Sequence, residues 1–199
     1  VDDSRLVVLN ALDAQTRGAT ILTRTKCISA TPNQTGSGWL ATLSNSKDGS
    51  SQQLHAQVIV NAAGPWARSC LSDVIKKLKA PLMRLVRGSH IVVPKLFDHD
   101  NAYIFQNPDR RIVFAIPYEQ SFTMIGTTDE DFDGDLDSIA PSTQEITYLC
   151  DTANRFFAQH TSADDIVWSF SGVRPLLEDG SGHAEKVTRD YRLVLQETG

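Results

Sequence analysis

The sequence predicts an α+β fold in which an antiparallel sheet with helices follows part of a nucleotide-binding fold. Residues 58–66 read Val-Ile-Val-Asn-Ala-Ala-Gly-Pro-Trp, an apolar strand that breaks into a Gly-Pro turn. Nucleotide-binding α/β folds bind their ligands at such strand ends. Between residues 83 and 127, four strand-like runs are separated only by polar turns, which favours antiparallel pairing over βαβ units. We therefore expect residues 1–79 to form a partial nucleotide-binding domain and residues 80–199 to form an α+β domain that binds the substrate.

The first part is expected to begin with a helix and to continue as a β-meander. Asp2, Asp3 and Ser4 supply capping oxygens and negative charge at a helix start, and Gly18 supplies the stop. Strands are expected at residues 19–30, 39–43 and 54–62. Pro65 suits the first turn of a short helix that runs to about residue 78.

The second part is expected to contain the antiparallel sheet and one long helix. Its strand-like runs cover residues 83–94, 102–106, 111–117, 122–127, 166–175 and 186–195. The sequence Ser-Thr-Gln-Glu at residues 142–145 is typical of a capping box and predicts a helix from there to about residue 159. An acidic loop at residues 129–137 precedes this helix.

The composition excludes some classes of function. The chain has 199 residues, of which 41% are hydrophobic and 22% charged, and a net charge of −5. This acidic balance argues against nucleic-acid binding, which needs a basic surface. Cys27, Cys70 and Cys150 are odd in number and show no metal spacing, so we expect buried free thiols in a reducing compartment. No run approaches the ~20 apolar residues that span a bilayer, and no signal peptide is visible, so a cytoplasmic protein is expected.

Two patterns resemble ligand sites, but each is better interpreted without a ligand. Residues 36–41, Gly-Ser-Gly-Trp-Leu-Ala, match a relaxed dinucleotide fingerprint, which needs a strand before it and a helix N-terminus after it. A polar loop precedes this copy and an alternating strand follows it, so we interpret it as a hairpin turn. The acidic loop lacks the glutamate that closes an EF-hand loop, so no metal site is expected there.

Three positions are candidates for contact with a ligand at the ends of strands. Ala63 and Gly64 are small enough to let a ligand approach the backbone, although a plain strand-to-helix turn explains them equally well. Thr127 follows a glycine at a strand end, where its hydroxyl serves either as the edge of a pocket or as the cap of a turn.

Two charged or titratable side chains are the stronger candidates for chemistry. His90 follows Gly88 and Ser89, and an imidazole there can take a proton from a hydroxyl near neutral pH, but a lone histidine is more often structural. Arg174 lies in an otherwise apolar strand, where an unpaired charge is costly. Its guanidinium suits either a bound carboxylate or phosphate, or a structural ion pair. Arg189 adds a second positive charge unless its neighbour Asp190 neutralises it.

Five short strings occur along the chain in an order that is typical of one family. They are Asn-Ala-Ala-Gly-Pro-Trp, Gly-Ser-His-Ile-Val-Val-Pro, Phe-Ala-Ile-Pro-Tyr-Glu, Ile-Gly-Thr-Thr-Asp and Ser-Gly-Val-Arg-Pro-Leu. With these strings the sequence resembles the bacterial FAD-dependent, respiratory glycerol-3-phosphate dehydrogenases over essentially its whole length. The wider group is the flavin oxidoreductases that include D-amino-acid oxidase, so the resemblance implies that residues 1–79 are part of an FAD-binding domain.

The resemblance also implies a reaction and roles for residues. Members of the family oxidise sn-glycerol 3-phosphate to dihydroxyacetone phosphate and pass electrons through FAD to quinone at the membrane. By motif, FAD would be contacted by Ala63, Gly64 and Trp66. The catalytic residues would be His90, as the candidate base, and Arg174, and the substrate would be bound by Thr127, Arg174 and Arg189.

The sequence departs from the family pattern where the family binds the cofactor pyrophosphate. The N-terminal Gly-x-Gly-x-x-Gly unit, a second glycine-rich segment and a helical C-terminal domain are missing from the 199 residues. We therefore expect an interior fragment that by itself neither binds FAD tightly nor turns over substrate. The parent protein is expected to be peripheral to the inner membrane, and a homo-oligomer is one expected state of assembly. Alternatives are a related FAD-dependent amine or hydroxy-acid oxidase, in which Arg174 would hold a carboxylate, and a non-catalytic binding module.

Overall fold

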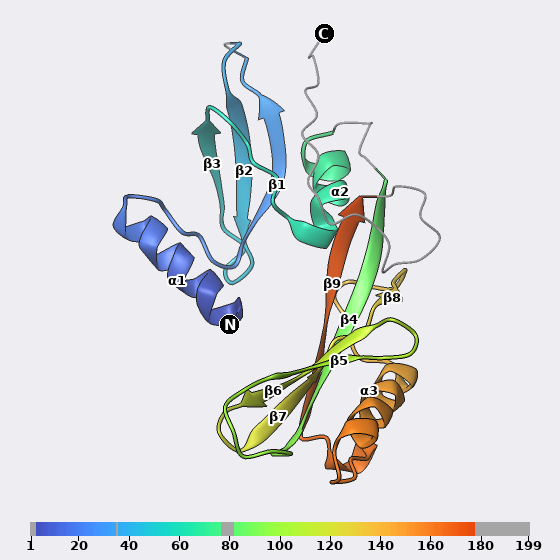
Figure 1. Cartoon of the computed structure of the whole chain (residues 1–199). Coiled ribbons are helices and arrows are strands. Elements are labelled where there is room, and N and C mark those ends of the chain that lie inside the picture. The colour runs from blue at the N-terminus through green and yellow to red at the C-terminus, as the bar shows by residue number, and fades with distance from the viewer. Residues whose placement is uncertain (1–2, 35, 77–81, 178–199) are drawn as a thin grey trace. The chain divides into compact units, whose positions relative to one another are not determined.

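The computed structural model describes residues 3–34, 36–76 and 82–177, and these fall into two compact units, each with its own sheet (Figure 1). The first unit takes the residues up to Ala62 and a segment that starts at Ser69. The second unit takes Ala63–Arg68 and, among the later residues that are described, 82–177.

The first unit contains the helix and the β-meander that the sequence predicts. Its elements are α1 (Asp3–Thr16), β1 (Thr25–Pro32), β2 (Trp39–Asn45) and β3 (Ser51–Ala56), and the strands are antiparallel in the order β1-β2-β3. The turn between β1 and β2 needs a glycine at position 38, because a Cβ there would lie 2.5 Å from the carbonyl oxygen of Ala56. Residues 36–41 are thus part of a hairpin, as predicted.

The predicted strand at residues 19–30 begins later than expected. β1 starts only at Thr25, and the preceding residue, Arg24, has a left-handed φ of +54°. Because that backbone conformation is incompatible with an extended strand, the prediction for residues 19–24 is wrong. The β-branched residues of this segment form a connection instead.

The predicted strand at residues 54–62 ends early as well. β3 stops at Ala56, and beyond it Val58 and Val60 are 72% and 83% exposed. A strand that is buried on both faces needs neighbouring strands and covering layers, and no described residue pairs with 58–60. The expectation of a buried strand at this point is therefore wrong for the structure of this chain.

A helical segment follows the Gly-Pro turn, as predicted from Pro65. It is built from a 3-10 turn (Gly64–Trp66), α2 (Ala67–Ser69) and a π-helical turn (Cys70–Val74). Among the described residues, no helix is long and apolar enough to cross a membrane.

The second unit is built on a six-stranded antiparallel sheet, which confirms the predicted α+β fold. Its strands are β4 (Met83–Pro94), β5 (Tyr103–Gln106), β6 (Ile112–Tyr118), β7 (Phe122–Gly126), β8 (Glu130–Asp131) and β9 (Trp168–Leu177). The order along the sheet is β5-β6-β7-β4, with β8 and β9 also paired to β4. The four predicted runs between residues 83 and 127 all form strands.

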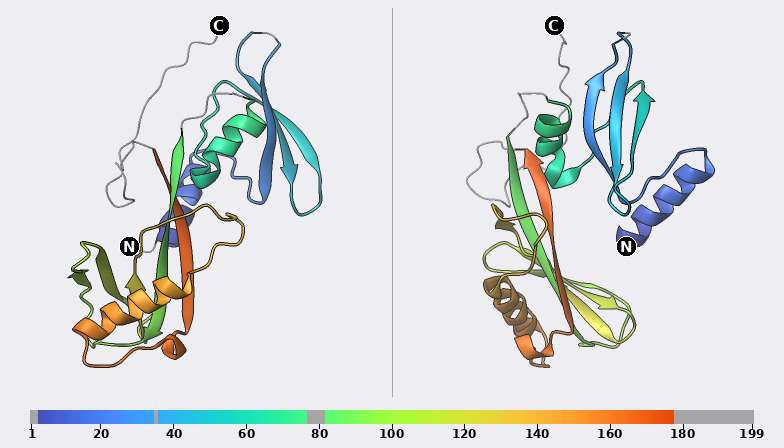
Figure 2. Two further views of the ribbon diagram at one scale, coloured as in Figure 1. Left: turned by 90° about the vertical axis from the view of Figure 1, so that its right-hand side faces the viewer. Right: turned by 180° about the vertical axis from the view of Figure 1, so that it is seen from behind.

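One face of this sheet is covered by α3 (Thr143–Phe156), as Figure 2 shows. The helix begins with the predicted capping box. The backbone N–H of Glu145 donates to the Ser142 side chain, and the backbone N–H of Ser142 donates to the Glu145 carboxylate. The core between helix and sheet consists of Ile91, Val93, Phe105, Val113, Ala115, Ile125, Leu149, Cys150 and Ala153. The predicted strand at residues 186–195 lies outside the described residues.

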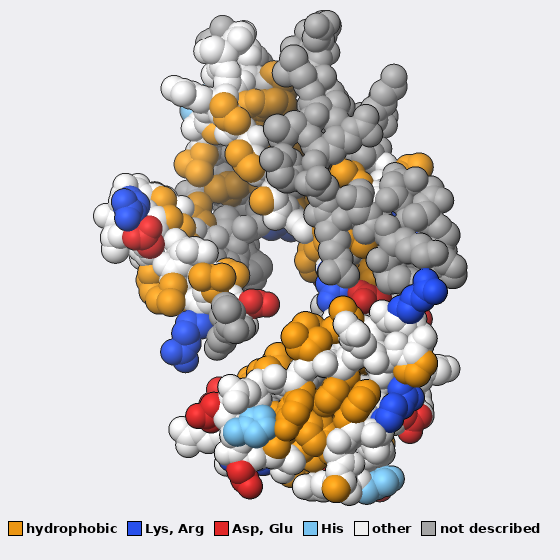
Figure 3. All heavy atoms as spheres, in the orientation of Figure 1, with side chains coloured by type: hydrophobic (Ala, Val, Ile, Leu, Met, Phe, Trp, Pro, Cys, Tyr) orange, Lys and Arg blue, Asp and Glu red, His pale blue; other side chains and the backbone are white. Residues whose placement is uncertain are grey.

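Some apolar side chains are exposed, and the three thiols are free. The side chains of α1 from Leu6 to Leu9 and Leu12 are about half exposed or more, and Figure 3 shows them along this helix. Cys150 is buried, whereas Cys27 and Cys70 are only partly buried. The expectation of free thiols is confirmed, and that of full burial holds for one of the three.

Candidate functional site

His90 and Arg174 lie on the face of the second sheet that α3 does not cover. In the register of β4 with β9, Val86 is opposite Arg174, Gly88 is opposite Gly172, and His90 is opposite Phe170. Residues directly opposite each other project to the same face, and alternate residues along a strand share it. The intervening residues of β4, such as Ile91 and Val93, join the core on the α3 side. The sheet therefore presents both candidate side chains on one face.

Thr127 and Arg174 converge over Gly88. A Cβ at position 88 would lie 2.5 Å from Oγ1 of Thr127 and 3.0 Å from Nη2 of Arg174. Nη2 of Arg174 donates a long hydrogen bond of 3.5 Å to that Oγ1, which in turn donates to the carbonyl oxygen of Thr128. The absence of a side chain at Gly88 is what allows the guanidinium and the hydroxyl to meet beside β4.

Arg174 also forms an ion pair, which is one of the two alternatives that its sequence context leaves open. Its Nη1 donates to Oδ1 of Asp129 at 2.6 Å, and the two side chains are 38% and 16% exposed. A guanidinium has five N–H donors, so this bond and that to Thr127 leave the group able to bind a further anion at its exposed edge. Asp129 was expected only as part of the acidic loop, and its pairing with an arginine 45 residues away has no local sequence signal.

His90 is held between β7 and β9. Its ring stacks on Phe170 with ring centroids 4.9 Å apart and an interplanar angle of 7°. On the other side it lies against Gly126, where a Cβ would overlap the ring. The peptide bond that joins Gly126 to Thr127 is cis. The glycine in the string Ile-Gly-Thr-Thr-Asp thus makes room for the imidazole.

Sequence reasoning missed a buried carboxylate on the other side of these strands. Glu145 is only 2% exposed and accepts hydrogen bonds from Ser89 Oγ at 2.8 Å and Thr128 Oγ1 at 2.6 Å. Its other oxygen accepts from the backbone N–H of Ser142 and pairs with Nη2 of Arg87, both at 2.8 Å. Burial alone would raise the pKa of Glu145, but these hydrogen bonds and the charge of Arg87 together lower it below its ordinary value.

The predicted cofactor-contacting residues belong to the same unit as His90 and Arg174. The segment Ala63–Arg68 is part of the second unit, and its turn Gly64–Trp66 contacts β9. Gly64 has a φ of +54°, and a Cβ there would meet no atom within 4 Å. Trp66 is 44% exposed. These residues present an open surface of small and aromatic groups beside the strand that carries Arg174.

Two remaining expectations concern Arg189 and the acidic loop. Arg189 lies outside the described residues. In the part of the chain that the structure describes, no three histidine, cysteine, aspartate or glutamate side chains are grouped closely enough to hold a metal ion. Three carboxylates of the loop are instead paired with arginines: Asp129 with Arg174, Glu130 with Arg111 and Asp131 with Arg84.

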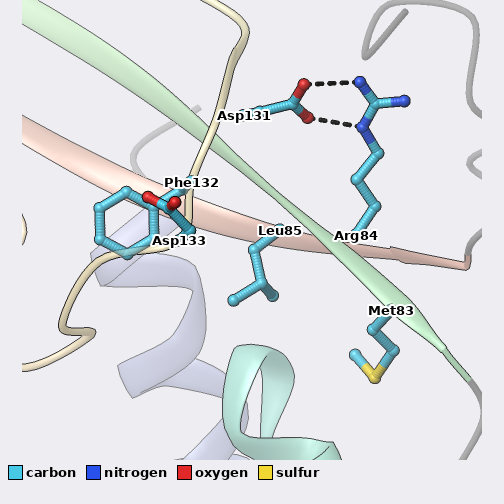
Figure 4. Close-up of a pocket in the computed structure, with 6 residues that line it drawn as sticks. All are labelled: Met83, Arg84, Leu85, Asp131, Phe132 and Asp133. Carbon is cyan, nitrogen blue, oxygen red and sulfur yellow. Dashed lines mark hydrogen bonds and ion pairs between the residues drawn. The ribbon is translucent and has the colours of Figure 1, made fainter. Parts of the chain in front are cut away.

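A recess of about 330 Å³ lies at the N-terminal end of β4. It is lined by Met83, Arg84, Leu85, Asp131, Phe132 and Asp133. Figure 4 shows that Arg84 and Asp131 face each other there, with Nε and Nη2 donating to the two carboxylate oxygens at 2.5 and 2.6 Å. The opposite charges of Arg84 and Asp131 therefore compensate each other at this recess.

Comparison with known proteins gives one consistent result. A sequence profile for the FAD dependent oxidoreductase family (DAO) matches residues 1–196. A glycerol-3-phosphate dehydrogenase of Pseudomonas aeruginosa is 49% identical over 98% of this chain and 38% of its own length. A D-erythritol 1-phosphate dehydrogenase of Brucella abortus is 45% identical over 100% of this chain and 39% of its own length.

A solved structure agrees with these relatives. The X-ray structure of the glycerol-3-phosphate dehydrogenase from Bacillus halodurans, complexed with FAD, matches with a TM-score of 0.80 and 31% identity. The match covers 91% of this chain and 36% of that protein. The chain thus spans well under half the length of the proteins that it resembles.

Proposed function

Because the chain belongs to the family of FAD-dependent oxidoreductases, we propose that it forms the substrate-binding part of an enzyme that oxidises sn-glycerol 3-phosphate to dihydroxyacetone phosphate. The observation that carries this proposal is the 49% identity, over 98% of the chain, with a glycerol-3-phosphate dehydrogenase. In this proposal residues 1–79 contribute part of the FAD-binding domain, and residues 80–199 contribute the substrate domain.

The residues of this chain fit one end of FAD and not the other. The face of the second sheet that α3 does not cover suits a flat ring system. It carries the His90–Phe170 stack and lies beside the open Ala63–Gly64 turn. The pyrophosphate needs backbone N–H groups at a glycine-rich helix N-terminus, and the one relaxed fingerprint in the sequence, at residues 36–41, lies in a hairpin. We therefore assign Ala63, Gly64 and Trp66 to contact with the flavin.

The side chains on this face have different roles in the proposed reaction. FAD, when bound, would supply the acceptor for the hydride, a hydrogen with two electrons, that leaves C2 of the substrate. His90 accepts the proton of the C2 hydroxyl, which leaves a carbonyl group at C2. Arg174 holds the anionic phosphate through the guanidinium donors that Asp129 does not use, and Thr127 donates or accepts a hydrogen bond beside it. Arg189 is assigned to the same anionic end.

The later fate of the electrons is a separate part of the proposal. By family resemblance, we propose that the whole protein passes them to quinone while it is attached peripherally to the cytoplasmic side of the inner membrane, as a homo-oligomer. Quinone reduction in the presence of membrane vesicles tests this part. A protein that reduces soluble dyes but no quinone under any membrane condition would contradict it.

The second candidate substrate is D-erythritol 1-phosphate, because the dehydrogenase of Brucella abortus is 45% identical over the whole chain. Both substrates carry a terminal phosphate next to a short polyol, so the same arginine serves either. Dye reduction by the whole flavin-loaded protein, measured with each substrate in turn, separates them. We expect the larger kcat/KM for glycerol 3-phosphate, and the reverse order would transfer the assignment to the four-carbon substrate.

We further propose that the 199-residue chain by itself binds no FAD tightly and is inactive. The support is the lack of a pyrophosphate-binding loop in its sequence. Titration of the isolated chain with FAD, followed by flavin fluorescence, is expected to show no saturable tight binding. A chain that purifies with bound flavin would disprove this statement.

A further inference from the structure

We infer that Glu145 is a positioning residue for the proposed site, an inference that rests on the proposed function. The site lies on the face of the second sheet that α3 does not cover, and Glu145 reaches the same strands from α3 on the opposite face. From the α3 side of the sheet, its carboxylate holds in place the backbone segments that carry His90 and Thr127. Through Ser89 and Ser171 it is also linked by hydrogen bonds to the strand that carries Arg174.

The contacts of Oε1 join two segments that are distant in sequence. Ser89, which donates to Oε1, lies between Gly88 and His90 on β4. Thr128, which also donates to Oε1, directly follows Thr127. The two segments are tied a second time, because the backbone N–H of Ser89 donates to Oγ1 of Thr128 at 2.9 Å. One oxygen therefore sets the distance between the candidate base and the candidate substrate-binding hydroxyl.

A third strand is linked through a shared hydroxyl. Oγ of Ser89 lies 2.7 Å from Oγ of Ser171 on β9, three residues before Arg174. The hydrogen-bonded chain Glu145–Ser89–Ser171 thus connects α3 to the strand that presents the guanidinium. Such a buried network specifies one arrangement when all its members are satisfied, and the network of Glu145 has a partner for each oxygen.

A role as a helix cap alone does not explain these contacts. A capping-box glutamate needs one oxygen for the backbone N–H of the N-cap residue, and Oε2 fills that role for Ser142. The other oxygen accepts hydrogen bonds from Ser89 and Thr128 instead. The side chain is also only 2% exposed, although a capping side chain can remain in water at little cost. Burial of a carboxylate is expensive, and this one is retained where it orders the strands of the site.

The test compares two variants of the whole, flavin-loaded protein in the glycerol 3-phosphate assay. Glu145→Gln keeps the size of the side chain but turns one acceptor oxygen into an N–H donor, so it cannot serve all four partners. Ser142→Ala is the matched control, because it removes the other half of the capping box, the Glu145 N–H to Ser142 Oγ bond of 3.2 Å, and leaves every carboxylate contact in place. Flavin content and thermal midpoint are measured for both.

We expect Glu145→Gln to lower kcat/KM by about 10- to 100-fold at normal flavin content, since a misplacement of about 1 Å can cost about 100-fold. Ser142→Ala should stay within about twofold of the parent protein, because helix-cap losses act on stability. Equal kinetics for the two variants would overturn the inference. An unmodified protein without activity towards the substrate would instead refute the proposed function.

A milder variant and a double substitution complete the test. Thr128→Val removes one donor to Glu145 and preserves shape, and it is used if Glu145→Gln does not fold. It too should lower kcat/KM at normal flavin content, and unchanged kinetics would overturn the inference. If Glu145 acts through Thr128, the double variant should lose less than the product of the two single losses, whereas independent, multiplicative losses would count against positioning.

Discussion

At the scale of single residues, Arg174 donates hydrogen bonds to Asp129 and to Thr127. We expect Arg174→Ala to lower kcat/KM for glycerol 3-phosphate by about 10- to 100-fold, because hydrogen bonds between charged groups are worth about 1.5–3 kcal/mol. Flavin content should remain normal. Steady-state kinetics and flavin absorbance of the whole protein measure both quantities.

The control for this variant is Lys95→Ala, which removes another cation–carboxylate pair of the same unit, that of Lys95 with Asp98 just beyond Pro94 at the end of β4. Its kinetics should match those of the unmodified protein. If Arg174→Ala loses flavin or stability and the substrate KM is unchanged, the arginine serves only the ion pair with Asp129.

The glycine at position 88 offers a second test at this scale. We expect Gly88→Ala to destabilise the protein by about 1–3 kcal/mol, since the new Cβ would press on Thr127 and Arg174. Gly172→Ala, on the opposite strand, should cost much less, because a Cβ there meets no atom within 4 Å. Thermal unfolding of the two variants measures the difference, and equal midpoints would show that the convergence over Gly88 is not tight.

At the scale of elements, the junction between α3 and the sheet should make stability depend on pH. Because the pKa of Glu145 is lowered on folding, its contribution is complete above the unfolded glutamate value of about 4.3 and is lost as the pH falls through the lower folded value. We expect the unfolding free energy of Glu145→Gln to decline less than that of the unmodified protein between neutral pH and pH about 3. Parallel declines in urea titrations would contradict this.

The same elements show what the sequence could predict. The four runs between residues 83 and 127 were predicted well, since polar turns punctuate them and each strand pairs with a neighbour in this chain. The capping box at Ser142 was equally clear, because it is a local pattern. The apolar run at residues 58–60 misled the prediction, since its character as a strand depends on partners that the described residues do not supply.

The candidate site was predictable only in part, for a related reason. His90, Thr127 and Arg174 could be proposed as candidates because each breaks an apolar pattern or follows a glycine. The pairing of Arg174 with Asp129 and the contacts of Glu145 with Ser89 join residues 45 and 56 positions apart. No spacing rule connects residues so distant, and only the register of the sheet and the packing of α3 bring them together.

At the scale of the whole molecule, the sheet has a partly aromatic face that α3 does not cover, and the chain belongs to the family of FAD dependent oxidoreductases. We propose that His90 supplies the base on this face, Arg174 the phosphate-binding guanidinium and Thr127 the hydroxyl. The two relatives named above differ in the polyol that they oxidise and agree in the phosphate. The phosphate-binding role that we propose for Arg174 would therefore be the same for both candidate substrates.

The most direct measurement is the anaerobic addition of sn-glycerol 3-phosphate to the whole protein loaded with FAD. We predict that the visible absorbance of oxidised flavin bleaches, because the substrate reduces the cofactor without any added electron acceptor. Persistence of the oxidised spectrum with glycerol 3-phosphate, in a sample whose flavin dithionite still reduces, would contradict the assignment of this chain to glycerol 3-phosphate oxidation.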